Sequence, residues 1–245
     1  MTLSVSDDLR QATKNARAVL FDLDGTLLDT ALDMGGALND VRAELGLSPI
    51  SAHTIRGFVS HGASALVRLG FPTSSEDEFS RLKERFLSVY EERLCTATEP
   101  FPGVMGSLNQ LESHGIPWGI VTNKPKWLTE PLLKHFGLLG RVGVLVCGDT
   151  LSERKPHPLP LQYAAVELQV MPGQCIYIGD AERDVLAARA ASMPVLVALF
   201  GYISEGELPR EWPASGWLES PREMNEVLGW IGRQSSMAKI PDRKP

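Results

Sequence analysis

The stretch Ala18-Val19-Leu20-Phe21-Asp22-Leu23-Asp24-Gly25-Thr26 decides the fold of this chain. A short apolar run stops abruptly at two aspartates and a glycine, which is typical of a buried strand that delivers polar groups at its carboxyl end. A strand that is apolar on both faces belongs to a parallel sheet covered by helices on both sides. We therefore expect an α/β protein with a site just beyond Phe21.

The residues that follow this strand have a helical pattern only. Residues 31–45 carry apolar residues at helical spacing and end at Gly46, and a long charged stretch over 76–94 has the same character. No strand pattern occurs between them. We predict that residues 30–98 form a separate all-helical cap domain inserted after the first strand.

Beyond the insert, apolar strands alternate with helices. We predict strands at 117–121, 142–146, 175–178 and 195–199, and helices at 104–114, 127–136, 159–168 and 185–191. This alternation favours a Rossmann-like parallel sheet covered on both faces. The predicted domains are an α/β core of residues 17–29 and 99–233, the cap at 30–98, and flexible tails at 1–16 and 234–245.

The composition excludes several classes of protein. The chain has 245 residues, 43% of them hydrophobic, and a formal net charge of −6. An acidic chain is a poor partner for nucleic acid or an anionic membrane. The three cysteines lack the spacing of a zinc site or disulfide framework, no apolar run spans a membrane, and the N-terminal segment lacks the apolar region of a secretory signal. We expect a cytoplasmic protein.

Polar side chains follow four of the predicted strands. Ligands bind at the carboxyl ends of strands in an open parallel sheet, so these residues should share one site. They are Asp22, Asp24, Gly25 and Thr26 after the first strand, Thr122 and Asn123 after the second, Lys155 after the third, and Asp180 and Asp184 after the fourth.

Clustered carboxylates repel one another unless a cation lies among them. Mg²⁺ prefers oxygen ligands and is usually held by one or two carboxylates together with a substrate phosphate. We predict a Mg²⁺ site formed by the carboxylates of Asp22 and Asp180, with the main-chain carbonyl of Asp24 as a further ligand. Asp184 would bind the ion directly or through water.

The same residue types suit phosphoryl transfer, which requires positioning and charge stabilisation. We assign Asp22 as the nucleophile that becomes an aspartyl-phosphate. Asp24 would protonate the leaving alcohol and then deprotonate the attacking water. Thr122 would donate its hydroxyl to a phosphoryl oxygen, and Lys155 would neutralise charge on the transferring group. The turn at Gly25 would let backbone N–H groups approach the phosphate.

The stretch Phe21-Asp22-Leu23-Asp24-Gly25-Thr26-Leu27 resembles the first motif of the haloacid dehalogenase superfamily. Thr122, Lys155 and the segment Gly179–Asp184 resemble its second, third and fourth motifs, in order, and the resemblance covers residues 17 to about 230. Asp24 separates the chain from the superfamily's dehalogenases and phosphonate hydrolases, which lack an aspartate there.

Three further segments resemble the phosphoglycolate phosphatase branch of that superfamily. They are Val121–Pro125, Lys155–Pro158 and Phe200–Ile203. The branch includes relatives that act on N-acetylmuramic acid 6-phosphate, and the sequence does not choose between the two substrates. The resemblance implies a small-molecule phosphate ester as substrate. It also implies a cap loop that reaches this substrate, with His61, Gly62 and Arg56 as candidate binding residues beside Gly25, Thr26 and Asn123.

Other interpretations of these residues stay open at this stage. Thr122 would serve equally as a helix cap, Asp184 as a residue of a helical first turn, and Arg56 as a solvated arginine. A hexose phosphomutase of the same superfamily would use the same catalytic residues. A phospho-receiver domain also carries an acidic pair, a threonine and a lysine, but its nucleophile lies on a middle strand and no helical insert follows the first strand.

Overall fold

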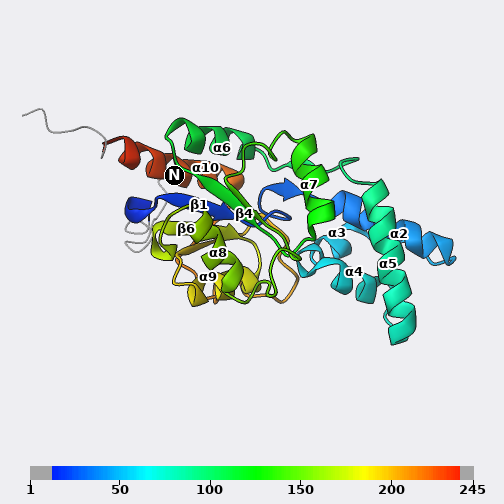
Figure 1. Cartoon of the computed structure of the whole chain (residues 1–245). Coiled ribbons are helices and arrows are strands. Elements are labelled where there is room, and N and C mark those ends of the chain that lie inside the picture. Colours follow the sequence, from blue (N-terminus) through cyan, green and yellow to red (C-terminus); the bar gives the residue numbers. More distant parts are fainter. Residues whose placement is uncertain (1–12, 238–245) are drawn as a thin grey trace, which may run out of the picture.

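The computed structural model describes residues 13–237, which form a parallel sheet with flanking helices and an inserted helical cap (Figure 1). The sheet has six strands in the order β5-β4-β1-β6-β7-β8, and all neighbouring pairs are parallel. The strands are β1 (Ala18–Phe21), β4 (Trp118–Val121), β5 (Val144–Val146), β6 (Cys175–Gly179), β7 (Val195–Ala198) and β8 (Gly216–Leu218). The predicted fold class is therefore confirmed.

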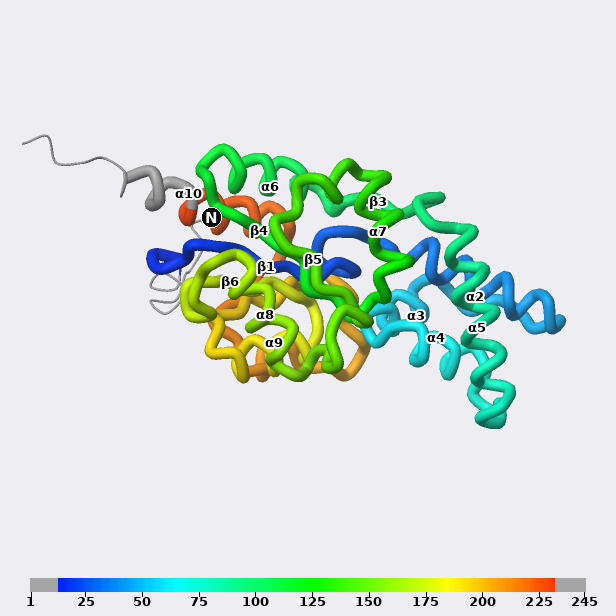
Figure 2. The backbone as a smooth tube through the Cα atoms, in the orientation of Figure 1, coloured from blue at the N-terminus to red at the C-terminus, as the bar shows by residue number. Residues whose placement is uncertain are grey.

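Strand β1 lies between β4 and β6 and is buried on both faces, as its apolar sequence requires. Val19 and Phe21 belong to the hydrophobic cluster that contains residues of α6 and α10, whereas Ala18 and Leu20 belong to the cluster of α8 and α9. Figure 2 shows these two helix pairs on opposite sides of the sheet. The core helices are α6 (Val104–Ser113), α7 (Lys126–His135), α8 (Leu159–Glu167), α9 (Glu182–Ala190) and α10 (Pro221–Met237), with a short 3-10 helix, η2 (Pro172–Gln174).

The cap consists of helices that lie beside the sheet (Figure 1). Its elements are α2 (Ala31–Glu44), α3 (Ala52–Arg56), the 3-10 helix η1 (Val59–His61), α4 (Gly62–Gly70) and α5 (Glu76–Glu92). Helix α5 begins at a capping box made by Ser75 and Glu78, and it packs against α2 and α4. Its exposed face is charged, while Phe86, Val89 and Tyr90 are buried.

Two short strands connect the cap to the core. They are β2 (Leu28–Asp29) and β3 (Glu99–Pro100), which pair with each other in an antiparallel arrangement. Next to them, the fully buried Asp33 of α2 accepts hydrogen bonds from the backbone N–H groups of Ala97 and Thr98 and from the Thr98 hydroxyl, at 2.7–3.0 Å. A buried carboxylate requires such donors. These hydrogen bonds hold the two connections side by side, because Asp33 follows the first connection and Thr98 precedes the second.

Several elements were not predicted from the sequence. Strand β8 and the pair β2–β3 have only two or three residues each, too few for a periodic pattern. Helix α10 was also missed, and it continues to Met237, past the predicted end of the core at residue 233. The domain boundaries themselves stay predictions. Of the predicted tails, residues 1–12 and 238–245 lie outside the described residues.

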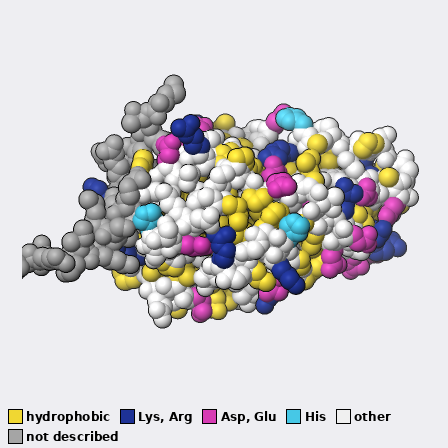
Figure 3. Space-filling model, turned by 90° about the horizontal axis from the view of Figure 1, so that it is seen from above, with side chains coloured by type: hydrophobic (Ala, Val, Ile, Leu, Met, Phe, Trp, Pro, Cys, Tyr) yellow, Lys and Arg dark blue, Asp and Glu magenta, His cyan; other side chains and the backbone are white. Residues whose placement is uncertain are grey.

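The surface has no large region of one charge on the face seen in Figure 3, where lysines and arginines are interspersed with aspartates and glutamates. This agrees with the small net charge of −6. Within residues 13–237, none of the helices has the length and apolar character needed to cross a membrane.

Candidate active site

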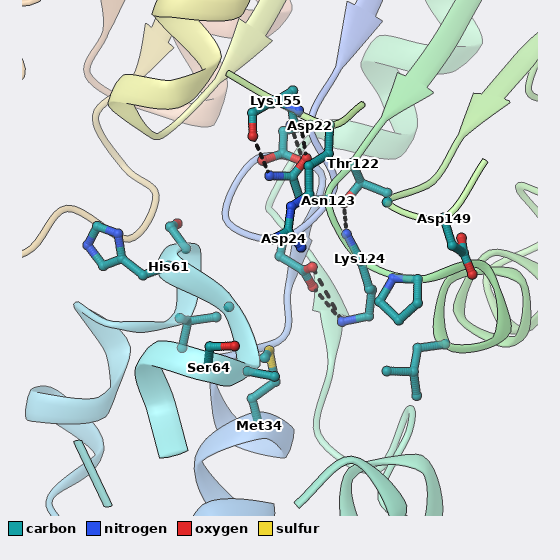
Figure 4. A pocket seen from close by; sticks show the side chains of 18 of the residues that line it. Asp22, Asp24, Met34, His61, Ser64, Thr122, Asn123, Lys124, Asp149 and Lys155 are labelled. Atoms are coloured by element: carbon teal, nitrogen blue, oxygen red, sulfur yellow. Dashed lines mark hydrogen bonds and ion pairs between the residues drawn. The ribbon is translucent and has the colours of Figure 1, made fainter. Parts of the chain in front are cut away.

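The residues predicted to follow the strands do meet at one edge of the sheet. Asp22 follows β1, Thr122 follows β4, Lys155 lies in the loop after β5, and Asp180 follows β6. All four are buried. Figure 4 shows Asp22, Asp24 and Lys155 on one side of a pocket, with His61, Ser64 and Met34 of the cap opposite them.

The pocket between core and cap has a volume of about 580 Å³. Core residues at its wall include Asp22, Asp24 and Lys155, and cap residues include Ser60 and Lys83. Sites for small molecules typically have volumes of roughly 300–1,000 Å³. The pocket is therefore large enough for a metabolite and has reactive groups on its core side.

Lys155 is the centre of the core side of the site. Its ammonium nitrogen lies 3.0 Å from Asp22 Oδ1, 2.8 Å from Asp184 Oδ1 and 2.7 Å from the Tyr177 hydroxyl, and the side chain is completely buried. An ammonium group has three N–H donors, so these partners satisfy it. The lysine is therefore held beside Asp22 by the core alone.

Asn123 fixes the backbone of this lysine. Its amide nitrogen donates to the carbonyl of Lys155 at 2.9 Å, and its oxygen accepts from the N–H of Lys155 at 3.1 Å. Both polar ends of the side chain are thus occupied by Lys155. The structure places Asn123 as a support for the lysine, and its predicted contact with substrate stays a prediction.

Three carboxylates gather beside Lys155. Oxygen atoms of Asp22, Asp180 and Asp184 lie within 4.8 Å of one another. Asp180 Oδ2 accepts hydrogen bonds from Ser60 Oγ and the backbone N–H of Tyr202, but Oδ1 is buried and has no hydrogen-bond donor among residues 13–237. A buried carboxylate oxygen without a donor is costly, and a cation would satisfy it; three carboxylates form a donor set that suits Mg²⁺. The residues therefore fit the predicted ion.

The pKa values of the three carboxyl groups reflect their burial and their closeness to one another. Burial, together with the neighbouring Asp22 and Asp184, raises the pKa of Asp180 to about 7. Burial also raises the pKa of Asp22, against the opposing effect of Lys155. Although burial alone would raise it, Lys155 and Arg183 hold the pKa of Asp184 below its usual value. Asp180 is thus the carboxylate whose charge is least compensated by the protein.

Gly25 allows the loop after β1 to lie close to the three carboxylates. Its φ is +83°, a conformation that side chains disfavour, and an added Cβ would lie 2.1 Å from Asp180 Oδ2. Thr26 follows in the same turn and is fully buried, away from the pocket wall. The turn therefore brings the loop after β1 against Asp180.

Asp24 faces away from the acidic cluster. Its Oδ1 accepts a hydrogen bond from the Thr30 hydroxyl at 2.7 Å and lies 3.0 Å from Lys124 Nζ. The side chain lines the pocket, as does Thr122, whose hydroxyl accepts from the backbone N–H of Lys124. The carboxylate of Asp24 is thus available for the substrate, and its main-chain carbonyl stays a predicted metal ligand.

The candidate residues of the cap lie in different places. Gly62 and His61 line the pocket, but the ring of His61 contacts Ser204 Oγ at 3.2 Å on the core. Arg56 does not line the pocket, because its guanidinium pairs with both oxygens of Asp29 at 2.9 Å and lies over the ring of Tyr202. Both side chains join cap to core, and their roles in substrate binding stay predictions.

Sequence reasoning missed several residues of the site. They are Ser60, Tyr90, Lys124, Tyr177 and Arg183. Arg183 lines the pocket with its guanidinium 3.7 Å from Asp22 Oδ2. It lies between Asp180 and Asp184 in the sequence, a position that could have drawn attention to it. Ser60 directly precedes the predicted cap-loop residues His61 and Gly62, which could also have drawn attention to it. Tyr90 has no such signal, because only the packing of the cap brings it to the core.

Comparisons with known proteins place the chain among hydrolases. The sequence profile of the haloacid dehalogenase-like hydrolases matches residues 19–198. A phosphoglycolate phosphatase of Xylella fastidiosa (strain Temecula1) is 44% identical over 91% of this chain and 98% of its own length. An N-acetylmuramic acid 6-phosphate phosphatase of Pseudomonas aeruginosa is 38% identical over 86% of this chain and 94% of its own. The crystal structure of a predicted phosphoglycolate phosphatase from Haemophilus somnus superimposes with a TM-score of 0.79 at 26% identity, covering 87% of this chain and 98% of that one.

Proposed function

Because the chain belongs to the haloacid dehalogenase-like hydrolases, we propose that it is a Mg²⁺-dependent phosphatase that hydrolyses a small phosphate ester through an aspartyl-phosphate on Asp22. The observation that supports this most directly is the set of three buried carboxylates around Lys155, with Asp22 at the pocket wall. Mg²⁺ bound by Asp22, Asp180 and Asp184 would neutralise negative charge, so that an anionic ester can approach an anionic nucleophile.

The protein's own groups account for the two chemical steps. In the first, an oxygen of Asp22 attacks phosphorus, the ester P–O bond breaks, and Asp24 gives its proton to the leaving alcohol oxygen. In the second, Asp24 takes a proton from water, the water oxygen bonds to phosphorus, and the bond between phosphorus and Asp22 breaks. Lys155 and Arg183 lie 3.0 Å and 3.7 Å from oxygens of Asp22, where they stabilise the charge of the transferring group.

The pocket also bears on the class of substrate. Lys83 of α5 and Arg154 of the core line it, and neither side chain forms an ion pair with another described residue. Two such cations favour a substrate with a second anionic group besides its phosphate. Phosphoglycolate and N-acetylmuramic acid 6-phosphate, the substrates named in the relatives, each carry a carboxylate. We propose one of these two as the substrate.

A panel of phosphate esters tests the proposed function. Inorganic phosphate release would be measured with Mg²⁺ and with EDTA, on phosphoglycolate, N-acetylmuramic acid 6-phosphate, nucleotides and hexose phosphates. We expect Mg²⁺-dependent release that is fastest with one of the two carboxylate-bearing esters. Full activity in EDTA would contradict the metal assignment. An isomerised hexose phosphate without free phosphate would replace the phosphatase by a mutase.

A further inference from the structure

A second buried lysine, Lys124, stands beside the other aspartate of the first motif. Its side chain is only 4% exposed, and its ammonium nitrogen lies 3.0 Å from Asp24 Oδ1 and 3.3 Å from Oδ2. Figure 4 shows Lys124 reaching Asp24 from the loop after β4, separately from the contact between Lys155 and Asp22. Each of the two aspartates thus has a lysine of its own.

The second residue that binds the ammonium group of Lys124 comes from the cap. The hydroxyl of Tyr90 accepts a hydrogen bond from Lys124 Nζ at 2.7 Å, and Lys124 is its only hydrogen-bond partner within the described part of the chain. Tyr90 is fully buried on α5, where its ring stacks on Phe86. Because Tyr90 belongs to the cap and Lys124 to the core, this hydrogen bond exists only when α5 is seated on the core.

The contacts of Asp24 distinguish its two oxygens. Oδ1 is held by Lys124 and by the Thr30 hydroxyl, at 3.0 and 2.7 Å, whereas Oδ2 has only the longer contact with Lys124. Oδ1 therefore anchors the carboxylate, and Oδ2 is the oxygen with fewer contacts and more capacity to exchange a proton. Without Lys124, Thr30 alone would hold the carboxylate, and its rotation would spoil the alignment on which proton transfer depends.

We propose that Lys124 is a positioning residue for proton transfer by Asp24, and that Tyr90 fixes Lys124 in place only when the cap covers the pocket. This rests on the proposed function, because it concerns the step in which Asp24 protonates the leaving alcohol. Lys124 keeps its own protons throughout. The proton moves only between Asp24 Oδ2 and the leaving alcohol or the attacking water.

Leaving groups of different basicity test this role. An alkyl phosphate needs a proton on its leaving oxygen, whereas p-nitrophenyl phosphate releases a stable phenolate without one. The ratio kcat/KM reports substrate binding and the steps up to release of the alcohol, so a loss confined to the alkyl ester reports the protonation step. It would be measured for both esters with the wild type, Lys124→Met and Tyr90→Phe. Lys126→Met, an exposed lysine at the start of α7, and Tyr163→Phe, an exposed tyrosine on α8, serve as matched controls.

General acid catalysis contributes roughly 10²–10⁴-fold, so we expect Lys124→Met to lower kcat/KM for the alkyl ester by about 10²-fold and Tyr90→Phe by about fivefold. The aryl ester should change by less than about twofold in each variant, and the controls should match the wild type. In an Asp24→Asn background, Tyr90→Phe should have no further effect, since coupled residues are not additive. Tyr90→Phe keeps the ring that stacks on Phe86, so it carries the test if Lys124→Met does not fold.

Two results would overturn the proposal in distinguishable ways. Equal losses on both esters, with an active wild type, would show that Lys124 binds the phosphate or supports the fold, and only the positioning role would fall. A wild type that releases phosphate from neither ester would remove the proposed function, and the role of Lys124 with it.

Discussion

The core wall of the pocket and its cap wall are held by different kinds of contact. On the core wall, Lys155 is fixed by Asp22, Asp184 and Tyr177, which all belong to the core. Tyr177 lies in β6, Asp22 follows β1, and Asp184 lies in α9. On the cap wall, Ser60 and Tyr90 have polar contacts that cross to the core, to Asp180 and Lys124. The contacts of Lys155 are therefore complete within the core, whereas those of Ser60 and Tyr90 form only when the cap is seated on the core. Because the two sets of contacts are separate, substitutions can disturb the catalytic residues of the core or the seating of the cap one at a time.

The largest effect should follow from breaking the core wall at the nucleophile. We expect Asp22→Asn to lower phosphate release by at least about 10⁴-fold, because an amide cannot form the aspartyl-phosphate. The pocket and fold should be retained, which circular dichroism would check. Asp77→Asn, an exposed aspartate on α5, is the matched control. Turnover near the wild-type rate would rule out covalent catalysis by Asp22.

A somewhat smaller effect should follow from changing the carboxylate whose oxygen lacks a donor. Asp180→Asn removes one charge from the acidic cluster, and we expect roughly a 10²-fold loss of activity or more, since metal ions supply several kcal/mol of charge stabilisation. Raising the Mg²⁺ concentration should restore part of it. The control is Glu182→Gln, an exposed neighbour of Asp180. An unchanged Mg²⁺ requirement would show that Asp180 does not bind the ion.

A substitution on the cap wall should have a smaller effect on activity. Ser60→Ala removes the 2.6 Å hydrogen bond from the cap to Asp180 Oδ2, which leaves the Tyr202 N–H as the remaining donor to that oxygen. We expect the Mg²⁺ concentration for half-maximal activity to rise by about tenfold, because residues that orient metal ligands affect affinity on this scale. Ser80→Ala, on the outer face of α5, should leave it unchanged. A Ser60→Ala enzyme with normal Mg²⁺ dependence would separate the cap from the metal site.

The smallest effect should be one of substrate preference. Lys83→Met removes a cation from the cap wall of the pocket. We expect KM for a carboxylate-bearing ester to rise by about threefold, the scale of a partly exposed ion pair, and KM for p-nitrophenyl phosphate to stay constant. Lys134→Met, on an exposed helix end, is the control. An equal rise for both esters would show that Lys83 attracts the phosphate instead of the carboxylate.

The same division explains what could be predicted from the sequence. The positions of Asp22, Thr122, Lys155 and Asp180 were predictable because each follows an apolar strand, and parallel strands bring their carboxyl ends to one edge. The fold class followed from the same alternation. These residues are close in space because of backbone topology, which the pattern of apolar residues reveals.

The contacts between the cap and the core could not be predicted in this way. Tyr90 is one of several apolar residues at helical spacing on α5, and its meeting with Lys124 depends on how α5 lies against the core. His61 and Arg56 were proposed from their place in the cap, but their side chains contact Ser204 and Asp29. By contrast, α10 had a readable pattern, since Met224, Val227, Leu228 and Ile231 are buried at helical spacing.

The pairing of β2 with β3 bears on the order in which the parts of the chain fold during synthesis. Strand β1 must wait for its neighbours β4 and β6, which are synthesised after the whole cap. Joining distant segments costs more entropy as the intervening loop grows. A cap that folds first, with its ends held together by the β2–β3 pair and Asp33, in effect removes residues 30–98 from the length of that loop. We therefore expect that a cap folded during translation lowers the entropy cost of pairing β1 with its neighbouring strands once these have left the ribosome.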